Sequence, residues 1–364
     1  MELGLTEDDV DDISGFSREI AGVEIGVMLR EGPDGGKISL RCSPKYDAAA
    51  ICARLGGGGH RGAAGASVPE GLDAAKMASG ILIVDKPEDW TSQDVVAKLR
   101  GALHERRAGH GGTLDPMATG VLPVFFGRAT RAVEFFEHAE KTYETVLRLG
   151  LVTDTQDITG RVLEQRDAAS VTEADVRTVL PRFLGPQKQV PPMYSAIKIG
   201  GKKLYELARA GQEVARPARD ITIHALELLS CAPPDFTLRV HCSKGTYVRT
   251  LCHDLGAALG TGGCMAALRR TAAGAYTAAQ AVPLADILAH LAPESLLLPV
   301  DTLFAAHPAL TLTPAQEKCC RNGASFTLRF APGRYRLYAE SGEFLALGEV
   351  RDGRMETVKS FFAI

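Results

Sequence analysis

The spacing of apolar and polar positions predicts both helices and strands along most of the chain. An apolar run at residues 80–84 predicts a strand that Pro87 stops, and the apolar positions between 95 and 103 keep helical spacing behind a cap at Thr91 or Ser92. Further strands are expected at 141–151, 221–229 and 236–243, and further helices at 171–183 and 246–259. The pattern therefore predicts an α+β (mixed α/β) fold with a mainly antiparallel sheet.

The two ends of the chain have patterns of their own. Near the N-terminus, strands at 23–29 and 37–41 flank a turn, and a helix at 47–54 precedes a glycine-rich stretch. After residue 299 the pattern is β-rich, with a hairpin at 336–350 that turns at Ser341-Gly342. The small residues at 71–80 resemble a linker. We therefore expect three domains, at 1–78, 79–298 and 299–364.

Composition excludes several classes of protein. The 364 residues are 45% apolar and 23% charged, as in a soluble globular protein, and the single tryptophan argues against an aromatic-rich β architecture. No apolar run approaches the ~20 residues of a membrane span. The acidic N-terminus has no apolar core of a signal peptide, so the sequence predicts a cytoplasmic protein. Eight cysteines without a Cys-x-x-Cys pair predict core thiols and no metal site.

Charge does not decide whether the chain binds nucleic acid. The net charge is −3, but residues 1–78 hold 8 basic and 13 acidic residues, and the remainder is nearly neutral. Basic residues on one face would still supply phosphate contacts, although each one alone is also typical of a solvated surface. The candidates are Arg106, Arg107, Arg128, Arg131, Lys198, Lys202, Lys203, Lys244, Arg269 and Arg270.

A loop at residues 108–131 carries the strongest chemical signal. It reads Ala-Gly-His-Gly-Gly-Thr-Leu-Asp-Pro-Met-Ala-Thr-Gly-Val-Leu-Pro-Val-Phe-Phe-Gly-Arg-Ala-Thr-Arg. Glycines at 109, 111 and 112 before Asp115-Pro116 predict a tight loop that presents the aspartate at a cleft. On its own, this aspartate could equally be a turn residue that accepts backbone hydrogen bonds.

The longer text of this loop resembles the catalytic motif of the TruB family of tRNA pseudouridine synthases. The resemblance runs from Gly109 to Gly120 and extends, over about residues 80–300, to four further blocks in the same order. These blocks are Lys141-Thr-Tyr143, Gly150–Asp157, Gln189–Lys198 with Gly201–Tyr205, and Cys242–Gly256. The resemblance to the TruB family implies a pseudouridine synthase core with a small C-terminal β-rich domain that resembles PUA domains.

The resemblance also implies roles for individual residues. Asp115 would be the catalytic carboxylate, attacking C1′ or C6 or assisting a glycal intermediate, and Arg249 would keep it ionised. Tyr143 would stack on the flipped-out uridine, and His110 would contact RNA, since nothing near it in sequence would tune its pKa. Core packing for Tyr143 and an ordinary ion pair for Arg249 remain open. The remaining substrate-binding candidates are Leu268, which could also be core, Lys198 and Tyr194.

The implied reaction converts uridine 55 in the tRNA T-loop to pseudouridine. It changes no oxidation state and hydrolyses nothing, so we expect no cofactor and no metal. The expected partner is tRNA, with no membrane, and the enzyme is expected to act as a monomer. The uridine must be flipped out of its stack, which needs a stacking surface in exchange.

The glycine-rich stretch 56–66 resembles the end of the DHHA1 domain of DHH-family phosphoesterases. It lacks the ending of a P-loop, and the chain lacks the Asp-His-His motif of that family's catalytic domain. His60 and Arg61 could contact RNA phosphate, or the segment could be a spectator, a fused neighbour or a start-site artefact. Two alternatives to a synthase follow: an RNA-binding module without chemistry, and a manganese-dependent nuclease.

Overall fold

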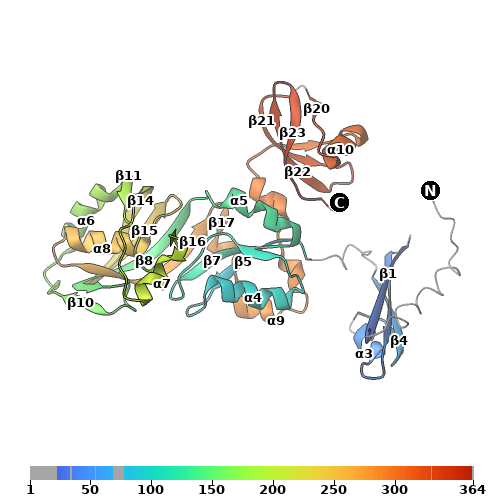
Figure 1. Cartoon of the computed structure of the whole chain (residues 1–364), viewed down its shortest axis with the longest axis horizontal. Coiled ribbons are helices and arrows are strands. Elements are labelled where there is room, and N and C mark those ends of the chain that lie inside the picture. Colours follow the sequence, from blue (N-terminus) through green and yellow to red (C-terminus); the bar gives the residue numbers. More distant parts are fainter. Residues whose placement is uncertain (1–22, 33–34, 54, 69–77, 329, 363–364) are drawn as a thin grey trace. The chain divides into compact units, whose positions relative to one another are not determined.

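The computed structural model describes residues 23–32, 35–53, 55–68, 78–328 and 330–362, and it divides the chain into two compact units, Met1–Met77 and Ala78–Ile364 (Figure 1). Of the linker predicted at 71–80, residues 71–77 lie outside the described residues, whereas Gly80 already belongs to the strand β5 (Gly80–Lys86). The predicted boundary after residue 298 remains a prediction, because the second unit includes everything from Ala78 onward.

The N-terminal unit is a small antiparallel sheet with one short helix. Its strands lie in the order β1-β2-β4-β3. The elements are β1 (Ile25–Gly32), β2 (Gly35–Cys42), α3 (Ala48–Ala53), β3 (Gly58–His60) and β4 (Ala63–Val68). Leu40 and Cys42 of β2 pack with Ala48 and Cys52 of α3, which gives the unit a core of its own.

A ten-stranded sheet forms the centre of the second unit, in the order β11-β14-β15-β8-β16-β7-β5-β18, with β6 paired to β7 and β17 to β16. Its pairs are antiparallel except β16 with β7 and β18 with β5. The strands are β5 (Gly80–Lys86), β6 (Ala108–His110), β7 (Thr119–Phe126), β8 (Lys141–Leu149), β11 (Gly185–Gln189), β14 (Arg219–Ala232), β15 (Asp235–Cys242), β16 (Gly263–Ala273), β17 (Tyr276–Thr277) and β18 (Val282–Pro283). The α+β prediction is thus confirmed.

Helices and two small hairpins complete this region. The helices are α4 (Ser92–Ala102), α5 (Val133–Phe136), α6 (Glu173–Val179), α7 (Leu204–Arg209), α8 (Val248–Ala258) and α9 (Leu284–Ala289). The hairpins pair β9 (Leu151–Thr153) with β10 (Val162–Gln165), and β12 (Lys198–Ile199) with β13 (Lys202–Lys203). Apolar side chains of α4 and α8, such as Leu99 and Leu251, are buried in one core cluster with the sheet residue Leu147.

The structure sharpens the predicted helix ends. Thr91, and not Ser92, caps α4 in a capping box with Asp94. Thr172 caps α6 as predicted. The α-helix ends at Val179 and a 3₁₀ turn follows at Leu180–Phe183, because Pro181 has no backbone N–H to donate the next α-helical hydrogen bond.

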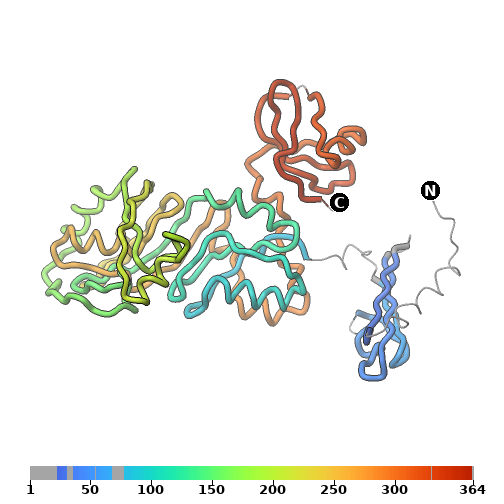
Figure 2. Tube along the Cα trace, in the orientation of Figure 1, coloured from blue at the N-terminus to red at the C-terminus, as the bar shows by residue number. Residues whose placement is uncertain are grey.

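The C-terminal residues form a five-stranded sheet in the order β19-β21-β22-β23-β20, drawn in red in Figure 2. The elements are β19 (Ala309–Thr311), α10 (Pro314–Arg321), β20 (Phe326–Thr327), β21 (Gly333–Tyr338), β22 (Phe344–Arg351) and β23 (Arg354–Ser360). Most of its buried residues form a separate cluster, but Leu347 and Phe361 pack with Ile81 and Phe136 of the central region. The hairpin predicted at 336–350 is present as β21 and β22.

The cysteines agree with one expectation from composition. All eight are free, and the six that are buried are core thiols. Among the described residues, no group of three His, Cys, Asp or Glu side chains is arranged to hold a metal ion. None of the helices in the described ranges is long and apolar enough to span a membrane.

Candidate active site

Asp115 lies in the loop between β6 and β7, and α4 holds this loop from one side. Ser92, at the start of α4, accepts a hydrogen bond from the Leu114 backbone N–H (2.8 Å) and donates one to the Leu114 carbonyl (3.2 Å). The backbone N–H of Asp89 donates to the Pro116 carbonyl at 2.9 Å. Leu114 and Pro116, the neighbours of Asp115 in the chain, are therefore held by hydrogen bonds, and this fixes the position of the Asp115 carboxylate.

Lys86, at the end of β5, also holds the Asp115 loop. Its side chain is fully buried at the end of β5, and its ammonium donates to the carbonyls of Pro87 (2.8 Å), Trp90 (2.5 Å) and Pro116 (3.1 Å). Burial lowers the pKa of Lys86 to about 8, although the negative charge of Asp115 opposes this shift. Lys86 thus places a positive charge near Asp115 while it bonds only to backbone oxygens.

Arg249, in the first turn of α8, meets the Asp115 carboxylate with two nitrogens. Its Nε lies 3.0 Å from Oδ2, and Nη2 donates to Oδ1 at 3.3 Å. Nη2 also donates to the Tyr194 carbonyl (2.9 Å) and Nη1 to the Thr155 carbonyl (3.3 Å), while Asp157 lies 3.7 Å from Nη1. Arg249 is only 6% exposed, so these partners fix its guanidinium independently of Asp115.

The electrostatic environment of Asp115 has opposing parts. Burial raises the pKa of its carboxyl above the ordinary value, and the nearby charge of Asp157 raises it further. The positive charges of Arg249 and Lys86 act against both effects. The Asp115 side chain remains 36% exposed, so a substrate atom can still reach it. The carboxylate is therefore desolvated and paired, yet accessible.

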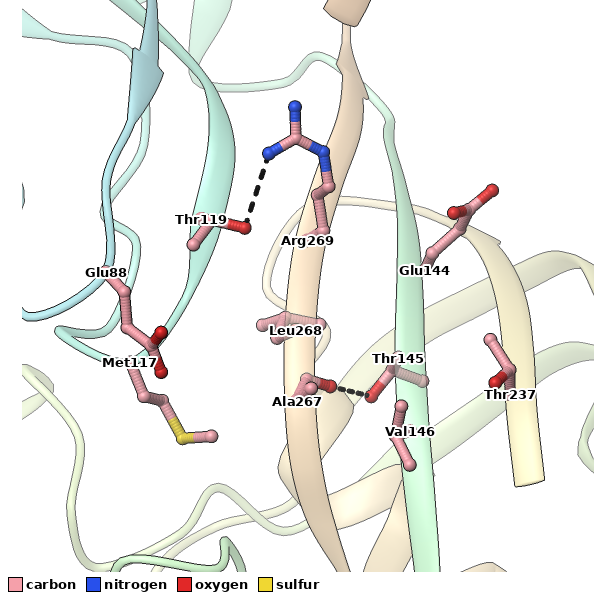
Figure 3. A pocket seen from close by; sticks show the side chains of 10 residues that line it. All are labelled: Glu88, Met117, Thr119, Glu144, Thr145, Val146, Thr237, Ala267, Leu268 and Arg269. Carbon is pink, nitrogen blue, oxygen red and sulfur yellow. Dashed lines mark hydrogen bonds between the residues drawn. The ribbon is translucent and has the colours of Figure 1, made fainter. Parts of the chain in front are cut away.

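Tyr143 and Leu268 lie on the neighbouring strands β8 and β16. Tyr143 is half-buried and stands opposite Arg270, while Leu268, 8% exposed, stands opposite Thr145. Burial raises the pKa of the Tyr143 phenol, and the charge of Arg270 partly opposes this. Leu268 lines a cavity of ≈ 330 Å³ together with Met117, two residues after Asp115. Figure 3 shows both side chains among the residues that line it, which include the charged residues Glu144 and Arg269.

The other predicted site residues contribute in different ways. His110 ends β6, and its pKa is lowered by burial and by the charge of Arg270, a residue that is distant in sequence. Tyr194 meets Arg249 through its backbone carbonyl. Lys198 is exposed on the β12–β13 hairpin, and no contact joins it to Asp115 or Arg249. Its RNA-binding role stays a prediction.

Four residues around this site were not identified from the sequence. Asp157 ends the motif block Gly150–Asp157, and Lys86 follows the predicted strand at 80–84, yet only the fold shows that they face Arg249 and the Asp115 loop. Ser92 was considered only as a helix cap. The sequence predicts a solvated surface charge at Arg270, whereas the residue is 1% exposed. The one available signal was that two charged residues, Asp85 and Lys86, directly follow the apolar run at 80–84.

The arrangement supports nucleophilic or electrostatic catalysis by one carboxylate. A desolvated carboxylate next to a fixed guanidinium can form a bond to an electrophilic carbon or stabilise a developing positive charge. Tyr143 on β8 and Leu268 on β16 lie on the neighbouring strands, and an aromatic ring near an apolar side chain favours a flat ring as substrate.

Comparison with known proteins assigns most of the chain. Residues 100–248 match the TruB family pseudouridylate synthase (N terminal domain), and residues 249–305 match the tRNA pseudouridylate synthase B C-terminal domain. Residues 1–81 match the DHHA1 domain. Both family resemblances expected from the motifs are therefore confirmed.

Two relatives illustrate the similarity. The chain is 46% identical over 282 residues to the tRNA pseudouridine synthase B of Pseudomonas aeruginosa (strain UCBPP-PA14), covering 75% of this chain and 92% of the relative. It is 45% identical over 283 residues to the protein of the same name from Azoarcus sp. (strain BH72), covering 77% and 94%.

Solved structures agree on the fold. An H/ACA RNP bound to a substrate RNA containing 2'-deoxyuridine matches with a TM-score of 0.61 and 20% identity, covering 94% of this chain and 96% of that one. A Cbf5-Nop10-Gar1 complex matches with a TM-score of 0.61 and 22% identity, covering 94% and 95%.

Proposed function

Because this chain belongs to the TruB family of pseudouridylate synthases, we propose that it isomerises uridine 55 of tRNA to pseudouridine and that Asp115 is its reacting carboxylate. The observation that carries the role of Asp115 is its two-nitrogen pair with Arg249, whose guanidinium is fixed by other partners. A carboxylate that is held ionised in a desolvated site is the group that this chemistry requires.

The reaction has a simple atomic balance. The C1′–N1 bond breaks, the freed uracil rotates, and C5 bonds to C1′; the proton on C5 leaves to solvent and N1 takes up one proton, so the product is an isomer of the substrate. Asp115 forms a transient bond at C1′ or at C6, or assists a glycal route; the geometry is compatible with each. In all three, Arg249 keeps the carboxylate charged before the reaction and holds it in place afterwards.

The other residues bind and orient the flipped nucleotide. Tyr143 offers an aromatic face for stacking, and Leu268 and Met117 are apolar residues that line the cavity. Burial and the charge of Arg270 lower the pKa of His110 and favour its neutral form. His110 therefore forms a hydrogen bond with the nucleotide, as donor or acceptor, and does not pair with a phosphate. We further propose that the protein acts as a cytoplasmic monomer on the T-loop, since one chain supplies all of these residues.

Tritium release tests the proposed function. A tRNA transcript that carries 5-³H-uridine loses its label to water when C5 bonds to C1′. We expect release in the presence of EDTA, since no step needs a metal, and none from a transcript with cytidine at position 55. Release that requires manganese and accompanies RNA cleavage would instead support a nuclease, and tight binding without release would support an RNA-binding module.

The pH dependence of catalysis reports the state of Asp115. Because its pKa is raised, kcat/KM should fall with decreasing pH already above the range of an ordinary aspartate, as the carboxyl takes up its proton. Asp157→Asn removes a negative charge that raises this pKa, so its acidic limb should move to lower pH. Asp154→Asn changes a half-buried aspartate that lies 3.9 Å from Arg161; it is the matched control and should not move the acidic limb. If the acidic limb of kcat/KM lay at the same pH in wild type and in Asp157→Asn, the electrostatic account would be contradicted.

Deleting residues 1–77 tests whether the DHHA1-like unit takes part in catalysis. The core clusters of the remaining chain contain only residues after 77, so we expect it to fold and to keep kcat within about twofold of the full chain. The measurement is tritium release from tRNA under saturating conditions. A loss of kcat far beyond twofold, with an unchanged circular dichroism spectrum, would give the N-terminal unit a functional role.

A further inference from the structure

Arg270 is a buried cation that the catalytic account leaves unexplained. It lies on β16, is 1% exposed, and ranks among the largest fully buried side chains. Within the described part of the chain, no carboxylate lies within ion-pair distance of its guanidinium. A charge without a counter-ion in the interior is unfavourable, so its contacts must compensate.

Those contacts are backbone oxygens on the two sides of Asp115. Arg270 Nε donates to the Val121 carbonyl at 2.7 Å, and Nη2 donates to the Gly112 carbonyl at 3.2 Å. Gly112 lies three residues before Asp115 and Val121 six residues after it. The planar guanidinium therefore joins the entrance and the exit of the loop, which a single-point ammonium cannot do in the same way.

The glycines of the loop fit closely around this arginine. Gly120 has φ +99°, and a Cβ there would lie 2.2 Å from the Arg270 carbonyl oxygen. Gly112 has φ +97°, with Nη1 of Arg270 3.5 Å from the place of its Cβ. Both positions need glycine for their left-handed backbone, and Gly120 also needs it for space. The loop and Arg270 are thus packed as one unit.

Arg270 also faces the second element of the site. In the register of β16 with β8 it stands opposite Tyr143. Its charge adds to the effect of burial in lowering the pKa of His110, and it opposes the burial that raises the pKa of Tyr143. One side chain therefore contacts the Asp115 loop and lies beside the residue proposed to stack on the base.

We propose that Arg270 is a positioning residue, which holds the Asp115 loop in register with Tyr143 so that the carboxylate and the stacked base meet. The inference rests on the proposed function of Asp115 and Tyr143. It also replaces the expectation that Arg270 contacts RNA phosphate, since its Nε and Nη2 are used on the loop and its side chain is buried.

The test separates positioning from binding. Arg270→Lys keeps the charge and loses the two-point geometry, and Arg270→Met loses both. For each we expect a single-turnover rate of tritium release about 100-fold lower, the cost of a small misplacement, with the Kd for tRNA within about threefold. Val176→Ala in α6, a buried position in the main core, controls for lost stability and should keep the wild-type rate. Gly112→Ala, which strains the bonded loop and leaves Arg270 intact, should slow the same step.

Titration of His110 by NMR adds a readout that a packing role would not move. The pKa of His110 should rise in Arg270→Met and stay lowered in Arg270→Lys. A wild-type rate in Arg270→Lys or Gly112→Ala, or rate loss matched by an equal loss of tRNA binding, would overturn the assignment. If wild type itself releases no tritium, the proposed function fails and the assignment with it; if wild type reacts, only the role of Arg270 is at stake.

Discussion

Asp115→Asn should lower tritium release from tRNA by at least about 10⁴-fold, because an amide has neither the charge nor the nucleophilicity of a carboxylate. The amide has nearly the same shape, and its oxygen can still face Arg249, so the loop should keep its conformation. We therefore expect the Kd for tRNA to stay within about tenfold of wild type. Filter binding and single-turnover tritium release measure the two quantities separately.

The control for this variant is Asp154→Asn, which removes a carboxylate from the loop after β9 without touching Asp115. It should keep the wild-type rate. Appreciable turnover by Asp115→Asn, at a rate that does not depend on the preparation, would remove Asp115 from the mechanism. A large loss of tRNA binding would instead mean that the aspartate is needed to form the RNA-binding surface.

Arg249→Met should be the second most damaging substitution. It removes the partner that opposes the raised pKa of Asp115 and leaves Asp115 and the buried Asp157 without their shared cation. We expect kcat to fall about 10²- to 10³-fold, as for loss of a preorganised electrostatic group, and the acidic limb of the pH profile to move to higher pH. Arg249→Lys keeps the charge but cannot reach all four partners, so its kcat should lie between those of wild type and Arg249→Met.

A matched control exists on the same sheet. Arg148 pairs with both oxygens of Asp235, through Nε at 2.7 Å and Nη2 at 2.5 Å, far along β8 from Tyr143. Arg148→Met also breaks a two-nitrogen pair but should leave kcat and the acidic limb unchanged. If Arg249→Met kept the wild-type kcat, the pair with Asp115 would be structural only.

The sequence was sufficient for the parts of the fold that depend on local pattern. Thr172 as a helix cap and the hairpin at 336–350 follow from neighbouring residues, and both are present. The order of the strands was not accessible in this way. The parallel pairing of β18 with β5 joins Val282 to Val84, almost two hundred residues apart, and no local signal specifies it.

The same distinction applies to the site. The motif resemblance predicted that Asp115 and Arg249 would meet, and the structure places them in direct contact. It did not predict that Ser92 would bond Leu114, or that Arg270 would be buried beneath the loop. Each of these contacts depends on which residues the tertiary fold brings together, and the amino-acid type alone suggested a helix cap in one case and a surface charge in the other.

Mapping the modified nucleotide tests the central claim most directly. An unmodified tRNA transcript is incubated with the full-length protein in EDTA, treated with a carbodiimide that marks pseudouridine, and read by primer extension. We predict one stop, which corresponds to position 55, in the reaction with wild type and none in the reaction with Asp115→Asn. A wild-type reaction without a stop, or with stops only outside the T-loop, would contradict the account.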